Sequence, residues 1–194
     1  MKLTGNEDLR VQKTMRGIRR AFEELLCEKD YPQITVKELC ERAQINKKTF
    51  YRYYPTLNDL LVELQDDIHG RYMERTEGMR IPEDLERITR EFCLFSAEQG
   101  EVYERITCAP SFREMSGSMQ ERVFEERPEA DVIPNIKGDE EKRLLMAFVT
   151  EATLGIYRQW AADGKKVSVE RMTAMTIELV CGGVERLTDA SNTE

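Results

Sequence analysis

Several residue patterns on which enzymes and metalloproteins depend are scarce in this chain of 194 residues. It has one histidine, His69, so histidine metal sites and Ser-His or Cys-His nucleophile systems lack a set of partners. The five cysteines are widely spaced and form no Cys-x-x-Cys pair, which argues against a thiolate zinc site and a disulfide framework. No glycine-rich phosphate loop is present. We therefore expect no catalytic activity, no metal and no cofactor.

Long apolar runs are also missing. No stretch approaches the ~18 consecutive apolar residues of a membrane helix, and residues 1–8 lack the apolar segment of a secretory signal. The unpaired cysteines suit a reducing compartment. These features predict a cytoplasmic protein with no membrane association.

Charge is distributed unevenly along the chain. The net charge is −8, but residues 1–65 hold 12 Lys or Arg against 10 Asp or Glu, whereas residues 66–194 hold 17 against 27. Two stretches, 9–22 and 42–58, contain no acid at all. Their cations are Arg10, Lys13, Arg16, Arg19, Arg20, Arg42, Lys47, Lys48 and Arg52. Charge alone is compatible with two interpretations of these stretches: a phosphate-binding surface, or an ordinary solvated helix face.

Apolar residues recur at steps of three and four almost throughout, and no segment alternates as a strand does. The pattern predicts an all-α protein of about nine helices, with Pro82 at the first position of one of them. It also predicts an N-terminal domain over residues 1–65 and a second domain over 66–194. The expected helices span about 8–28, 35–43, 46–53, 56–78, 82–100, a short one ending near 108, 111–128, 139–163 and 168–188.

The most informative stretch is 35–54, where two short capped helices flank a tight turn. Thr35 with Glu38 three residues later forms a predicted capping box, and Asn46 is the predicted cap of the second helix. Ile45, Phe50 and Tyr54 fit the inward side of that helix, which leaves a polar, basic outward side. Such a helix suits the major groove of DNA, because Lys and Arg bind guanine edges and phosphates.

This stretch resembles the DNA-binding domain of the TetR family of transcriptional regulators. The first helix, with Ile18, Ala21, Phe22 and Leu25, also resembles that of the family, so the resemblance covers about residues 10–65. Two positions depart from the family pattern: Gln44 replaces the turn glycine, and Leu57 replaces a lysine after the recognition helix. The matching residues are Thr35, Leu39, Ala43, Ile45, Asn46, Thr49, Tyr51, Tyr54, Asp59, Leu60 and Leu61.

The resemblance implies double-stranded DNA, as a palindromic operator, as the partner of this domain. It implies that the start of the first short helix approaches phosphate, that the start of the recognition helix meets base edges, and that Tyr51 contacts phosphate. The expected DNA-binding residues are Thr35, Val36, Lys37, Asn46, Lys47, Lys48, Thr49, Tyr51, Arg52 and Tyr53.

The resemblance further implies that residues 66–194 bind an effector and form a homodimer through the last two long helices. An ordinary intramolecular core would give the same apolar pattern, so both interpretations remain open. The expected interface residues are Gly155, Ile156, Trp160, Met175, Leu179 and Gly183. The expected lining of an apolar pocket for a small molecule is Phe92, Phe95, Phe112, Met115, Met119 and Phe148.

The sequence thus predicts a dimeric, sequence-specific transcriptional regulator, a repressor, whose operator affinity a small molecule modulates. The alternative is a helical protein-interaction module that keeps the fold without binding an operator. An enzyme is the third possibility, but no carboxylates and tyrosines are arranged for one.

Overall fold

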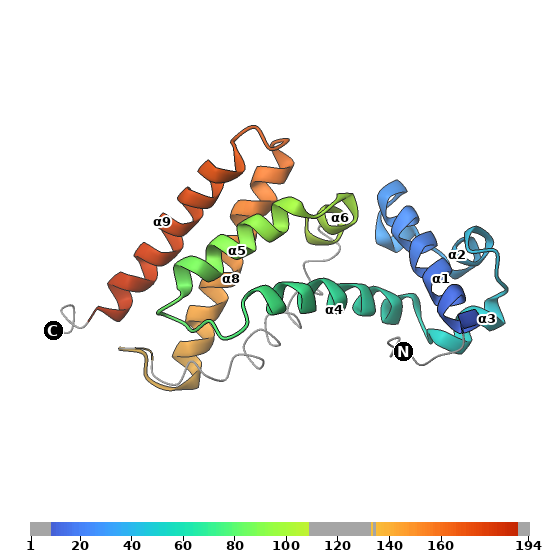
Figure 1. Ribbon diagram of the computed structural model, residues 1–194, viewed down its shortest axis with the longest axis horizontal. Helices are drawn as coiled ribbons and strands as arrows, with labels where there is room; N and C mark the ends of the chain where they lie inside the picture. Colours follow the sequence, from blue (N-terminus) through green and yellow to red (C-terminus); the bar gives the residue numbers. More distant parts are fainter. Residues whose placement is uncertain (1–8, 109–132, 134, 190–194) are drawn as a thin grey trace. The chain divides into compact units, whose positions relative to one another are not determined.

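The computed structural model describes residues 9–108, 133 and 135–189. Within these residues the chain forms eight α-helices, one short 3-10 helix and no strand (Figure 1). The predicted all-α class is therefore confirmed, while the helix predicted over 111–128 lies outside the described residues. Among the helices in view, none combines the length and the apolar character that crossing a membrane requires.

The described chain divides into two compact units. One contains residues up to 73 together with 100–108, and the other contains 74–99 together with the described residues from 133 onward. The helices of the first unit are α1 (Leu9–Glu28), η1 (Tyr31–Gln33), α2 (Val36–Arg42), α3 (Lys47–Tyr53), most of α4 (Leu57–Arg75) and α6 (Glu101–Cys108). Those of the second are α5 (Leu85–Glu98), α8 (Gly138–Ala162) and α9 (Val169–Thr188).

The first unit is built on the apolar face of α1. Met15, Ile18 and Phe22 recur at steps of three and four, and all are buried. The helix packs against α2 and α6, and α2 packs against α3. This core holds the two short helices, which are too short to be stable alone.

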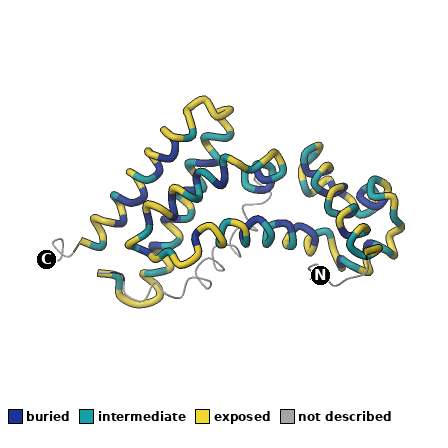
Figure 2. Tube along the Cα trace, viewed as in Figure 1, coloured by how far each residue is buried: buried dark blue, intermediate teal, exposed yellow. Residues whose placement is uncertain are grey.

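The second unit is a three-helix core in which α5, α8 and α9 pack against one another. Buried and exposed positions alternate along these helices (Figure 2). The hydroxyl of Ser168 accepts the Arg171 N–H at 3.2 Å and so caps α9, as predicted. The core residues of the second unit are Ile81, Leu85, Ile88, Ile133, Leu145, Val149, Val180, Cys181 and Val184.

The start of α5 corrects one prediction. Pro82 is not the first helical residue, because the helix begins at Leu85. The Leu85 N–H donates to the Pro82 carbonyl at 3.1 Å, and the Asp84 carboxylate accepts the Arg80 N–H at 3.1 Å. These bonds close a turn before the helix. The 3-10 helix at Tyr31–Gln33 was likewise not predicted.

The cysteines serve as small apolar residues. All five are free thiols; Cys40, Cys93 and Cys181 are buried, and Cys27 and Cys108 are half-buried. Burial raises the pKa of the Cys93 and Cys181 thiols. They therefore stay protonated near neutral pH and lack the reactivity of a thiolate.

Candidate nucleic-acid interface

Two side-chain caps define the helix pair α2 and α3. The Thr35 hydroxyl accepts the Glu38 N–H at 3.2 Å and begins α2. The Asn46 side-chain oxygen accepts the Thr49 N–H at 2.8 Å and begins α3. Both predicted N-caps are thus confirmed, and the helix boundaries agree with prediction to within one or two residues.

The turn between the two helices places Gln44 in the left-handed region, with φ of +55°. The Gln44 N–H donates to the Glu41 carbonyl at 3.2 Å, and the Ile45 N–H donates to the Cys40 carbonyl at 3.0 Å. This pair of bonds is the Schellman motif that usually ends at a glycine. Gln44 therefore adopts a backbone conformation that glycine would adopt without steric cost.

Gln44→Gly is expected to stabilise the protein by about 0.5–1 kcal/mol. The relieved left-handed strain, about 1–2 kcal/mol, exceeds the added unfolded-state entropy of glycine, about 0.4–1 kcal/mol. Urea unfolding followed by circular dichroism measures the difference. The neighbouring Ala43, at φ of −75°, provides the control, because Ala43→Gly should destabilise. Equal losses from the two variants would contradict the assigned strain.

The recognition helix α3 separates its faces as predicted. Phe50 and Tyr54 are buried, with 0% and 1% of their surface exposed. The Phe50 ring lies 5.4 Å from the Tyr51 ring, centroid to centroid, and Tyr51 is 53% exposed. The other predicted DNA-binding residues divide into exposed Thr35, Lys37, Asn46, Lys47, Lys48 and Arg52 and half-buried Val36, Thr49 and Tyr53.

The Tyr54 hydroxyl fastens the end of α3 to α4. It donates to the Glu63 carboxylate at 2.9 Å. Burial, reinforced by this bond, raises the pKa of Tyr54, so the hydroxyl keeps its proton. On the same helix α4, Asp67 accepts from Arg19 of α1, and Arg19 also pairs with Glu23 at 3.1 Å. Polar contacts, as well as the apolar core, therefore join α4 to α1 and to the end of α3.

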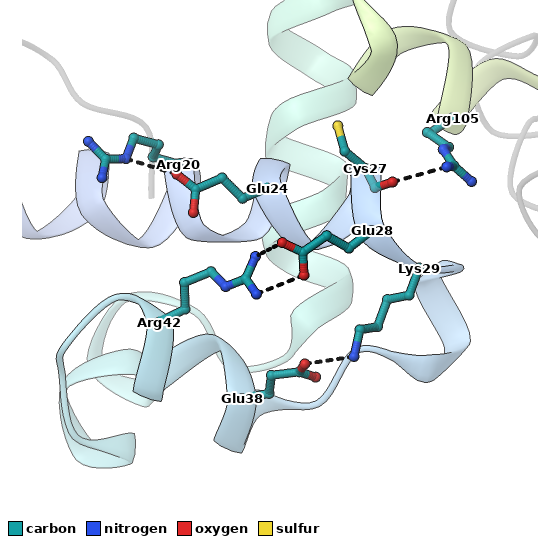
Figure 3. A network of polar contacts seen from close by, with 8 residues as sticks. All are labelled: Arg20, Glu24, Cys27, Glu28, Lys29, Glu38, Arg42 and Arg105. Atoms are coloured by element: carbon teal, nitrogen blue, oxygen red, sulfur yellow. Dashed lines mark hydrogen bonds and ion pairs between the residues drawn. The ribbon is translucent and has the colours of Figure 1, made fainter.

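Ion pairs join α1 to α2 (Figure 3). The Arg42 guanidinium binds Glu28 through two bonds of 2.5 and 2.7 Å, and Lys29 binds Glu38 at 2.6 Å. The hydrogen bond from Arg42 holds the pKa of the Glu28 carboxyl below its ordinary value. Arg42 belongs to a basic stretch of the sequence, but its charge is neutralised by Glu28 inside the unit.

The predicted interface residues of the second unit lie on α8 and α9. Gly155, Met175, Leu179 and Gly183 are exposed, whereas Ile156 and Trp160 are half-buried. The Trp160 indole N–H donates to the Val167 carbonyl at 2.7 Å, which ties Trp160 to the connection between α8 and α9.

Exposed apolar side chains on α8 and α9 form a surface that we call the apolar strip. A Cβ on Gly183 would lie 3.4 Å from the Phe148 ring, so the outer sides of α8 and α9 adjoin there. The strip comprises Leu144, Phe148, Met175, Leu179, Gly183 and Leu187, of which Leu144 and Leu179 are 73% and 60% exposed. Burial of such a surface would be favourable.

The predicted pocket residues do not all meet in one place. Phe95 is buried and Phe92 half-buried on α5. Phe148 lies instead on the apolar strip, with 47% of its surface exposed. Phe112, Met115 and Met119 lie outside the described residues.

A capped helix-turn-helix on an all-helical scaffold is an architecture typical of DNA-binding proteins. Residues 18–64 match the family model described as bacterial regulatory proteins, tetR family. The N-terminal part of the chain therefore matches the DNA-binding domain of this family of transcriptional regulators. No curated protein sequence matches the chain.

Solved structures share the fold over nearly the whole chain. A TetR transcriptional regulator from Streptococcus agalactiae 2603V superposes with a TM-score of 0.62 at 22% identity, covering 88% of this chain and 95% of that one. NalD, the secondary repressor of the MexAB-OprM multidrug efflux pump in Pseudomonas aeruginosa, gives 0.60 at 17% identity, covering 95% and 100%. The dihydroxyacetone kinase operon activator DhaS gives 0.55 at 17% identity, covering 91% and 98%.

Proposed function

We propose that this regulator is a homodimeric repressor that binds a palindromic operator through α3 and releases it when a small molecule binds the second domain. The outward face of α3 carries this proposal. Lys47, Lys48 and Arg52 are exposed there beside Tyr51, which supplies cations and a hydroxyl for base edges and phosphates. The buried Phe50 and Tyr54 keep that face in a fixed orientation.

The proposed dimer rests on the apolar strip. Two recognition helices must reach half-sites about one helical turn apart, which one copy cannot do. The strip supplies a surface that a second copy would cover by a two-fold axis, with the same residues on both sides. Dimerisation of this kind is typical of the family.

The proposed effector is a small molecule bound among the helices of the second domain, with Phe92 and Phe95 of α5 as candidate contacts. An effector lowers operator affinity only if it binds the state of the protein that releases the operator more tightly than the state that binds it. We propose repression in line with NalD, which is the secondary repressor of an efflux pump, although DhaS is an operon activator.

Selection of duplexes from a random pool tests operator binding. The native protein should recover a palindromic site, whereas Lys48→Ala combined with Tyr51→Phe should recover none. On the recovered site, Lys48→Gln alone should weaken binding about 10- to 100-fold, because a base-edge contact contributes about 1–3 kcal/mol. Thermal unfolding of each variant checks that the domain remains folded.

Failure of the native protein to enrich any duplex at low salt would contradict the proposal. The chain would then be better described as a helical interaction module that keeps the fold. Titration of the recovered operator complex with candidate small molecules tests the release step.

A further inference from the structure

Six cations of the first unit pair with carboxylates inside that unit. Arg20 pairs with Glu24 at 3.2 Å, and Lys37 lies 3.9 Å from Glu41. Arg19, Lys29, Arg42 and Arg105 also pair with carboxylates. Cations without a carboxylate partner in the described part of this unit include Lys13, Arg16, Lys47, Lys48 and Arg52.

Two of these available cations lie on α1 and not on the recognition helix. Lys13 and Arg16 are three residues apart, so they project from one side of the helix. Both are exposed, while Met15 and Ile18 between and beside them are buried. Arg16 donates to the side-chain amide oxygen of Gln12 at 3.0 Å, which is an uncharged partner.

The absence of acid along this part of α1 explains why Lys13 and Arg16 have no carboxylate partner on their own helix. Residues 9–22 contain no Asp or Glu, whereas Glu23, Glu24 and Glu28 neutralise cations around the second half of the helix. In Figure 1 the beginning of α1 and the helix α3 lie at the same end of the unit. The chain as a whole carries −8, so a polyanion can approach only where cations are concentrated.

We propose that Lys13 and Arg16 bind DNA phosphates, so that α1 extends the nucleic-acid interface beyond the helix-turn-helix. This inference rests on the proposed function of α3. Both residues precede position 18, where the match to the family model begins, and so belong to the part of the chain that the family model does not describe.

The salt dependence of binding to a fluorescein-labelled duplex of about 30 base pairs, of one fixed mixed sequence, tests the proposal. Phosphate contacts dominate such non-specific binding, so the operator need not be known. Between about 50 and 200 mM KCl, the slope of log K against log[KCl] should fall in magnitude by roughly 0.9 for each lost contact. Lys13→Gln with Arg16→Gln should therefore reduce it by about 2 per bound subunit and weaken binding about 30-fold near 0.15 M salt.

Arg20→Gln is the matched control, because it removes the same charge from an exposed turn of the same helix but from an existing ion pair. It should change the slope by less than half as much as Arg16→Gln. Equal effects of the two would mean a response to net charge and would overturn the proposal. A native slope in the double variant, with a reduced slope in Lys48→Gln, would overturn it while leaving the function of α3 intact. Native slopes in every variant would overturn the proposal, and the duplex selection described above would then decide the function of α3.

Discussion

Phe50→Ala should remove about 3–5 kcal/mol from the free energy of unfolding. The Phe50 ring is fully buried and lies 5.8 Å from the Tyr54 ring, so truncation leaves a cavity under the recognition helix. Urea unfolding followed by circular dichroism measures the loss. Operator binding should fall with it, because α3 loses its support.

The adjacent Tyr51 provides a matched control. It is aromatic as well, but its side chain is exposed to solvent. Tyr51→Ala should change stability by less than about 1 kcal/mol and weaken DNA binding through lost contact with the duplex. A Phe50→Ala variant no less stable than Tyr51→Ala would show that the inward face of α3 is assigned wrongly.

Leu179→Asp should abolish the proposed dimer without unfolding the subunit. An unpaired charge buried in an interface costs about 2–5 kcal/mol, and a two-fold axis places it there twice. We therefore expect the dimer dissociation constant to rise by more than about 100-fold. Sedimentation equilibrium measures the dissociation constant, and the thermal unfolding of the variant checks that the subunit remains folded.

Val167→Asp is the control for this substitution. Val167 is exposed to a similar degree as Phe148, but it lies in the connection between α8 and α9 and not on the apolar strip. The Val167→Asp variant should therefore still dimerise. If Leu179→Asp dimerises as tightly as the native chain, the apolar strip is not the interface.

Features set by neighbouring residues were predictable from the sequence. The caps at Thr35, Asn46 and Ser168 depend on bonds that span three residues, so a short motif contains all the information. The outward and inward faces of α3 follow from helical periodicity for the same reason. The start of α5 was placed three residues early, because the Asp84 carboxylate stabilises a turn that the position of Pro82 does not reveal.

Features set by tertiary contacts could not be predicted. Arg42 and Glu28 are 14 residues apart, and Arg19 and Asp67 are 48 apart. Which cations face DNA therefore depends on how the helices cross, and composition alone counts Arg42 as available when it is not. Phe148 shows the same limit: its apolar character fits a pocket and an interface equally, and only the contact with Gly183 places it on the apolar strip.

The unit that contains the helix-turn-helix is discontinuous in the sequence. Its last helix, α6, follows α5, and Arg105 donates to the Cys27 carbonyl near the end of α1 at 3.0 Å. A fragment truncated at residue 73 would lack α6 and uncover the side of α1 against which it packs. Truncation would thus yield an incomplete form of the first unit. A fragment that keeps this unit whole would need α6 connected to α4 through a designed linker.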